Sequence, residues 1–277
     1  MKSLLVIGAG YVGAELVRQA HSAGWNAIPC TRSGEDDTTA LDVSNLDSLA
    51  AVKAGIITPE VIVHCASSGR GGEDAYRAVF ETGVNNIQSI FPNTPLIFVS
   101  SSSVYAQING ETVTEDSPSE PTRETGKILK RAEATVLSNQ GIVARLSGIY
   151  GPGRSVLIKR LLKGEAQIEE DGRRLINQIH QQDAAGALLF LCQNYERLKG
   201  EVFNVTDSNP RSQKAIYEGL CKLLELPLPP VGKRDLNRKR GWTHKAVSNN
   251  KILQAGWTPK HPDFLQTGIS IAQSLKT

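Results

Sequence analysis

The sequence predicts an α/β protein built on a doubly wound parallel sheet, with a small C-terminal lobe. Short apolar runs alternate with longer helix-like segments through the first half of the chain, and a glycine-rich turn directly follows the first run. After Gly151 this alternation loosens. Strands covered by helices on both faces are apolar throughout, so the alternation of such runs with helices indicates a parallel sheet.

Five apolar runs are expected to form this sheet. They are residues 4–7, 27–30, 61–65, 96–100 and 142–146. Between the first two runs, Val12, Leu16 and Ala20 recur at helical spacing, and Gly24 stands where a helix would end. The first strand, this helix and the second strand therefore make a βαβ unit.

The rest of the chain is expected to be mainly helical. Helices are predicted at residues 124–138, 156–162, 183–193 and 215–224, and a further strand at 202–205. The segment 226–230, Leu-Pro-Leu-Pro-Pro, is predicted to be an extended linker, because proline fixes the backbone and removes hydrogen-bond donors.

The composition is that of an ordinary globular protein. Of 277 residues, 40% are hydrophobic and 21% charged, and the net charge of +3 gives no general basis for binding nucleic acid or a membrane surface. Four widely spaced cysteines without a CxxC pair favour buried thiols in the cytoplasm. No apolar run is long enough to span a membrane. We expect a small-molecule substrate, a monomer or homodimer, and no metal site.

The glycine-rich turn has the pattern of a dinucleotide-binding loop. Gly8-Ala9-Gly10-Tyr11-Val12-Gly13 follows a strand and opens a helix, the context that distinguishes this pattern from a chance match. Gly8 permits the turn, Gly10 lets the backbone approach a pyrophosphate, and Gly13 lets helix and strand pack closely. We therefore expect a Rossmann-type cofactor domain over residues 1–150 and a substrate-binding lobe over 151–277, some of whose segments return to the first domain. The alternative is a plain glycine-rich turn.

The end of the second strand favours NADP over NAD. An NAD site usually has a carboxylate there for the ribose 2′-hydroxyl, whereas this chain has Thr31-Arg32-Ser33, and Arg32 suits a 2′-phosphate. Asp42, followed by Val43, is expected to accept from the adenine amino group. Arg32 as a solvated residue or an adenine-stacking one, and Asp42 as an ordinary turn or cap, remain alternatives.

Further motifs resemble those of the extended short-chain dehydrogenase/reductase family, the NAD(P)-dependent epimerase/dehydratase group. The resemblance covers nearly the whole chain and includes its C-terminal pattern Gly256-Trp257-Thr258-Pro259. The motifs, in family order after the glycine loop and Asp42-Val43, are Val63-His64-Cys65-Ala66-Ser67, Phe98-Val99-Ser100-Ser101-Ser102-Ser103-Val104-Tyr105, Arg145-Leu146-Ser147-Gly148-Ile149-Tyr150-Gly151-Pro152-Gly153 and Asn177-Gln178-Ile179-His180-Gln181-Gln182-Asp183. The resemblance implies that Cys65, Ala66, Ser67 and Ser100 contact the cofactor.

The chain departs from this family at its catalytic pair. The family uses a Ser or Thr with a YxxxK pair, in which lysine lowers the tyrosine pKa for proton transfer. Ser101 matches the Ser/Thr position, but alignment of the helix places Thr125 at the tyrosine and Leu129 at the lysine. Lys130 is one residue late, a rotation of about 100° on a helix, and Lys127 is two early.

Three interpretations of this departure stay open. The chain is an atypical enzyme whose acid/base lies elsewhere, with Tyr105, Tyr150 and Lys130 as candidates; or it binds the dinucleotide as a non-catalytic sensor or regulator; or substrate groups or water handle the proton. On the first interpretation, Ser101 and Tyr105 are the catalytic residues.

The substrate is expected to be small and anionic, similar to a nucleotide sugar. Residues 233–245 hold six basic residues against one aspartate, and the family often holds substrate phosphates with late basic residues. A solvated charged face is the alternative. The residues expected to bind substrate are Ser102, Arg154, His180 and Arg234, while Asp183 is expected to cap or orient.

Overall fold

The computed structural model describes residues 2–56, 58–69, 71–235 and 241–275. The chain forms two compact units, and each consists of segments that are separate in sequence. Unit 1 comprises Met1–Val104, Glu120–Arg145 and Ala185–Phe203, and unit 2 comprises Tyr105–Ser119, Leu146–Ala184 and Asn204–Thr277. The boundary expected at residue 150 stays a prediction.

The framework of unit 1 is a seven-stranded sheet with the order β12-β7-β5-β4-β1-β2-β3. Its strands are β1 Ser3–Ile7, β2 Asn26–Thr31, β3 Thr39–Ala40, β4 Val61–His64, β5 Leu96–Ser101, β7 Ile142–Leu146 and β12 Val202–Val205. β1 pairs in parallel with β2 on one side and β4 on the other. The chain thus leaves β1 in one direction and later returns to its other side, which makes the carboxyl end of β1 the switch point where such folds bind ligands.

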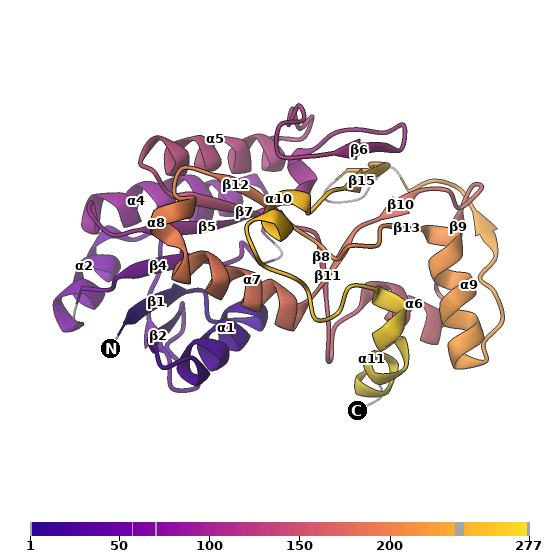
Figure 1. The fold of residues 1–277 in the computed structure, drawn as a ribbon, viewed down its shortest axis with the longest axis horizontal. Helices are drawn as coiled ribbons and strands as arrows, with labels where there is room; N and C mark the ends of the chain where they lie inside the picture. The colour runs from indigo at the N-terminus through magenta and orange to yellow at the C-terminus, as the bar shows by residue number, and fades with distance from the viewer. Residues whose placement is uncertain (1, 57, 70, 236–240, 276–277) are drawn as a thin grey trace. The chain divides into compact units, whose positions relative to one another are not determined.

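Helices cover both faces of this sheet (Figure 1). They are α1 Tyr11–Ser22, α2 Leu46–Gly55, α3 Glu73–Tyr76, the π-helix η1 Arg77–Thr82, α4 Gly83–Ile90, α5 Glu124–Ser138 and α8 Tyr195–Leu198, with the 3₁₀ turn η2 Ser102–Val104. α1 buries Val12, Leu16 and Ala20, the residues whose spacing predicted it. α1 lies on one face of the sheet, and α4 and α5 lie on the other.

Unit 2 is built from paired short strands and helices. Its strands are β6 Glu111–Val113, β8 Gly148–Tyr150, β9 Ile168–Glu169, β10 Leu175–Ile176, β11 Gln178–His180, β13 Arg211–Ser212, β14 Val231–Gly232 and β15 Lys245–Val247. They pair as β10-β13, β11-β8, β14-β9 and β15-β6. Its helices are α6 Val156–Leu162, α9 Gln213–Leu224, α10 Asn250–Gln254, η3 Phe264–Thr267 and α11 Gly268–Ser274. The helix α7 Gln181–Gln193 belongs to unit 2 up to Ala184 and to unit 1 from Ala185.

The predicted fold class is confirmed. The five predicted strands are β1, β2, β4, β5 and β7, and α5 and α6 have the predicted bounds. Residues 226–230 have no helix or strand, as the prolines indicated, although Pro230 accepts a hydrogen bond from Ile168 N at the start of β14-β9 pairing. Among the described residues, no helix is both long and apolar enough to cross a membrane.

Candidate functional site

The glycine loop is shaped by close backbone contacts that only glycine allows. Gly8 has φ +95°, and a Cβ added to it would lie 2.3 Å from the Cα of Ala66. A Cβ on Gly13 would lie 2.3 Å from the carbonyl oxygen of Gly8. Gly10 differs, because a Cβ there would meet nothing within 4 Å. Gly8 and Gly13 therefore serve packing, and Gly10 faces open space that a ligand could occupy.

The helix that starts at this loop has an N-terminus without a capping side chain. Gly10 is the N-cap of α1, and the first turn of the helix holds no acidic residue. The amides of Gly8 and Ala9 both donate to the carbonyl of Cys30, which ties the loop to β2. A helix N-terminus carries a partial positive charge and donors directed outward, so this arrangement suits a pyrophosphate.

Arg32 directly follows β2, where the 2′-phosphate was expected. Its side chain is exposed and has no hydrogen bond or ion pair within the described residues. Thr31 shapes the loop behind it by accepting from Gly34 N at 3.0 Å and bonding Thr38 Oγ1 at 2.6 Å, while Ser33 donates to Glu35. The Arg32 guanidinium can therefore meet an anion without breaking an existing contact.

Asp42 has a local structural partner. Its Oδ1 accepts from both the amide and the hydroxyl of Ser44, at 2.9 and 2.6 Å. Val43 accepts at its carbonyl from the amide of Asn86. The turn that was expected as the alternative role of Asp42 is therefore present. The contact of Asp42 with adenine stays a prediction.

The end of β4 passes beside the glycine loop. Cys65 Sγ donates to the carbonyl of Gly8 at 3.2 Å, and burial raises the pKa of this thiol to about 12, so it is not a reactive thiolate. Burial lowers the pKa of His64 to about 4, and its ring packs against Phe80 and Phe98. Ala66 lies against Gly8, and Ser67 is exposed.

A buried ionic network connects the end of β5 to α5 and β7. Ser100 Oγ donates to Glu133 at 2.6 Å, and Arg145 donates to both oxygens of the same carboxylate at 3.0 and 2.7 Å. Burial alone would raise the pKa of Glu133, but Arg145, Lys130 and Ser100 together hold it below its usual value. The hydroxyl of Ser100 is thus engaged in the fold. Arg145 belongs to one of the sequence motifs, but nothing in the sequence indicated that it pairs with Glu133.

Thr125 and Leu129, the residues aligned with the family's tyrosine and lysine, lie on α5. Leu129 is buried, Thr125 is half-buried and Lys127 is exposed. Lys130 forms an ion pair with Glu133 at 2.9 Å, which adds it to the buried network. The neighbouring Ser101 is buried at the last position of β5, and its Oγ accepts from Ser103 N at 3.2 Å.

The two tyrosine candidates lie in unit 2 and are both buried. Tyr105 has no exposed surface, and its hydroxyl donates to Asn204 Oδ1 at 2.9 Å. Tyr150 packs edge-on against His180 and Phe264, and burial raises its pKa above the usual value. The Tyr105 hydroxyl would have to leave Asn204 to reach a substrate, and its role as proton donor stays a prediction.

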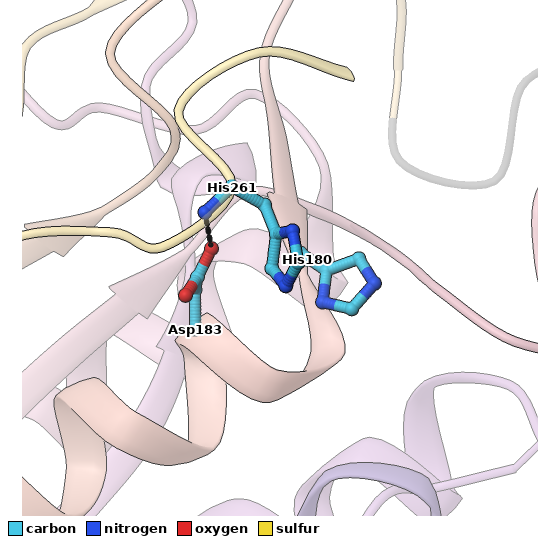
Figure 2. A group of neighbouring side chains, drawn as sticks. All are labelled: His180, Asp183 and His261. Atoms are coloured by element: carbon cyan, nitrogen blue, oxygen red, sulfur yellow. Dashed lines mark hydrogen bonds between the residues drawn. The ribbon is translucent and has the colours of Figure 1, made fainter. Parts of the chain in front are cut away.

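Figure 2 shows that His180, Asp183 and His261 gather at the start of α7. The imidazole centroids are 4.0 Å apart, and the possible ligand atoms of the three residues lie within 4.8 Å of one another. Both Asp183 oxygens accept backbone amides, of Lys260 and His261, at 2.8 Å, and His180 Nδ1 accepts from Gln182 N at 3.2 Å. Asp183 thereby orients the 260–261 segment. Spacing in the sequence gave no sign that His261 would join this group.

The arginines expected to bind substrate have different surroundings. Arg154 is exposed. Arg234 stacks over the Trp242 ring at 3.7 Å and pairs with Glu170 at 2.7 Å. Ser102 is half-buried in η2. Arg238, Lys239 and Arg240 of the basic stretch lie outside the described residues.

Comparisons with known proteins agree with this fold. The chain is 27% identical over 286 residues to protein YeeZ of Escherichia coli K12, covering 96% of this chain and 98% of that protein. It is 26% identical to UDP-glucose 4-epimerase of Corynebacterium glutamicum, covering 95% and 92%. The dTDP-glucose 4,6-dehydratase of Bacillus anthracis, solved with NAD, superposes with a TM-score of 0.82 at 20% identity, covering 100% and 97%.

The family model that describes NAD dependent epimerase/dehydratase proteins matches residues 4–206. That range contains the glycine loop, the ends of β2, β4 and β5, and the helix start at His180. The chain belongs to the NAD-dependent epimerase/dehydratase family.

Proposed function

We propose that the chain is an NADP-preferring oxidoreductase or epimerase/dehydratase-like enzyme that acts on a small anionic substrate resembling a nucleotide sugar. The observation that carries this proposal is the glycine loop, where Gly10 faces open space at the uncapped N-terminus of α1. The relatives named for UDP-glucose and dTDP-glucose support the substrate class. The four free cysteines, three of them buried, support a cytoplasmic location.

The cofactor is held mainly by backbone groups. The amides at the start of α1 would bind the pyrophosphate, and Arg32 would pair with the 2′-phosphate of NADP. When bound, the nicotinamide supplies or accepts a hydride. The chain contributes orientation through the rigid loop, which the Cys30 carbonyl and Ala66 hold in place.

Ser101 is the residue proposed to act on the substrate. Its hydroxyl stands at the end of β5, and the hydroxyl of neighbouring Ser100 is already bonded to Glu133. By donating to a substrate oxygen, Ser101 would stabilise the charge that develops there during hydride transfer. Thr125 cannot replace a phenol, because its hydroxyl does not ionise near neutral pH. The proton therefore moves through another residue of the chain, with Tyr105 as the first candidate, or through a substrate group or water.

A non-catalytic dinucleotide sensor is the second candidate function. Two observations favour it: Leu129 occupies the position of the family lysine, and Lys130 is committed to Glu133. A sensor would bind NADP as tightly as an enzyme does, so binding alone cannot separate the two functions.

Calorimetric titration of NADP and NAD tests the cofactor. We expect tighter binding of NADP, and we expect Arg32→Ala to remove the difference, a loss of about ten- to a hundredfold for a charge-assisted contact. Arg18→Ala, which removes an exposed arginine of α1, is the matched control and should change neither affinity. A wild type that prefers NAD would contradict the assignment of Arg32.

Turnover separates enzyme from sensor. Nucleotide sugars, alcohols and carbonyl compounds are screened by nicotinamide absorbance and by product analysis for epimers. With an active substrate, Ser101→Ala should lower kcat at least tenfold, and Thr125→Ala should leave it nearly unchanged. A large loss in Thr125→Ala would refute our view of this helix. Absence of any turnover, with NADP binding retained, would make the sensor the better description.

A further inference from the structure

Three side chains of metal-ligating type meet within unit 2. His180 is the last residue of β11, Asp183 lies in the first turn of α7, and His261 lies between α10 and η3. One possible ligand atom of each residue lies within 4.8 Å of the others, and Figure 2 shows the two imidazole rings side by side. Two imidazoles and a carboxylate are a donor set that zinc and neighbouring transition metals prefer.

Asp183 is a buried carboxylate without a cationic partner. It is 2% exposed, and among the described residues it forms no ion pair. Its two oxygens accept only the amides of Lys260 and His261, both at 2.8 Å. A carboxylate has about four acceptor sites, so these amides leave sites for an ion. Buried charges in proteins are usually paired or coordinate a metal, and here the positive charge is missing.

The surroundings of Asp183 add further negative charge. After burial itself, the charges of Asp263 and Asp183 raise the pKa of Asp207, so the three carboxylates share one region. Arg211 donates to both oxygens of Asp263 and is therefore already committed. An excess of carboxylates over cations attracts a divalent cation and repels an anion.

His261 already has the tautomer that a metal ligand needs. Its Nε2 lies 3.1 Å from Gln182 Oε1, an oxygen that only accepts, so Nε2 carries the proton and Nδ1 keeps its lone pair. Within the described part of the chain, no hydrogen bond involves this Nδ1. Ligating histidines commonly donate their other ring N–H to an oxygen in this way, which fixes the orientation of the ring.

His180 holds its ring beside that of His261, with the centroids 4.0 Å apart. Its Nδ1 accepts a long hydrogen bond of 3.2 Å from Gln182 N, so this lone pair is available to an ion in exchange for one weak bond. The group also borders solvent. Gln182 and Lys260 are exposed and His261 is half-buried, so an ion can reach the three residues from water.

We propose that His180, Asp183 and His261 bind a divalent transition-metal ion, with Zn²⁺ as the expected occupant. Mg²⁺ and Ca²⁺ prefer oxygen ligands and do not match two imidazoles. Neighbouring ligand atoms of a tetrahedral zinc ion lie about 3.4 Å apart, so the side chains would close by about 1 Å on binding. The ion would join the end of β11 to the segment at 260–261 and stabilise unit 2. This inference goes beyond the proposed function and does not depend on it.

Zinc titration of the metal-free chain tests the site. The protein is prepared without a polyhistidine tag, treated with EDTA and titrated with zinc chloride in a calorimeter, while the melting temperature is followed in parallel. We expect one Zn²⁺ per chain and a higher melting temperature, because an ion that binds only the folded state stabilises it. Magnesium chloride should produce neither effect.

His261→Ala is the main variant, since it removes a half-buried side chain and keeps the backbone amide that bonds Asp183. It should weaken Zn²⁺ binding by about tenfold or more and abolish the gain in melting temperature. His21→Ala removes an exposed histidine of α1 and is the matched control, with unchanged affinity expected. Unchanged affinity in His261→Ala, or an equal loss in His21→Ala, would overturn the proposal.

The absorption spectrum with Co²⁺ gives a second measurement on the wild type, independent of whether any variant folds. Nitrogen and oxygen ligands give weak visible bands, whereas cysteine ligands add an intense near-ultraviolet band from the thiolate. We expect the visible bands alone. A thiolate band, or no uptake of either metal, would refute the site.

Titration with NADP keeps this inference separate from the proposed function. His261→Ala should bind NADP as the wild type does, with or without Zn²⁺. If the wild type binds NADP but no Zn²⁺, the metal site is refuted and the proposed function stands. If Zn²⁺ binds and NADP does not, the metal site stands and the proposed function fails.

Discussion

Asp207 is the strongest test of the electrostatics inside unit 2. Its carboxyl is 2% exposed, and its hydrogen bond from Asn209 N is long, at 3.3 Å. Burial, assisted by the negative charges of Asp263 and Asp183, raises its pKa from 3.8 to about 8, against the opposing effects of Asn209 and Arg211. At neutral pH the folded protein should therefore keep a proton that the unfolded chain has lost.

The sign and size of the effect follow from this pKa. Between pH 3.8 and about 8 the folded state binds the additional proton, so stability falls as pH rises across this window. At about 1.4 kcal/mol per pH unit, the loss at pH 7 is about 4 kcal/mol. The side chain of Asp207→Asn is neutral at every pH, so the stability of this variant does not fall with pH for this reason. A buried amide without a partner lowers the stability of the variant by about 1–3 kcal/mol at every pH.

Chemical denaturation at pH 4, 5.5, 7 and 8.5 measures this directly. The stability of Asp207→Asn relative to the wild type should increase by about 5 kcal/mol between pH 4 and pH 8.5. Asp263→Asn is the control with the opposite sign. Burial would raise the pKa of Asp263, but its hydrogen bonds with Arg211 hold the pKa low, so this variant should lose stability above pH 4. A pH-independent difference between Asp207→Asn and the wild type would refute the protonated carboxyl.

Three further variants test the architecture of unit 1. Gly10→Val should abolish NADP binding in calorimetry while circular dichroism stays unchanged, because the new side chain enters the open space of the loop; retained affinity would make the loop structural. Glu133→Ala should lower the free energy of unfolding by about 3–5 kcal/mol by leaving Arg145 buried without its partner, whereas exposed Glu196→Ala should cost under about 1 kcal/mol. Gly8→Ala should lower the melting temperature, since its Cβ would lie 2.3 Å from Ala66 Cα; an unchanged temperature would show that the loop shifts freely.

Local pattern was sufficient to predict the framework of the protein. A buried parallel strand is apolar along its whole length, and an amphipathic helix repeats its apolar residues every three to four positions, so β1, α1 and α5 were readable from short windows. The glycine loop was equally readable, because its three glycines are closely spaced between β1 and α1, although the contact that requires Gly8 is with Ala66, after β4. The π-helix η1 was not predicted, since its wider turn has no distinctive residue pattern.

The partners of polar side chains were decided by tertiary structure. Ser100, Glu133 and Arg145 belong to three elements whose packing alone brings the carboxylate to the guanidinium. The burial of Tyr105 and the meeting of His180 with His261 likewise depend on residues distant in sequence.

The sequence alone thus determined the fold class, the glycine loop and the lack of tyrosine in the helix at residues 124–138, because each depends on residue types at close spacing. Which hydroxyls and charges remain available for chemistry depends on burial and on long-range hydrogen bonds, and only the folded chain decides these.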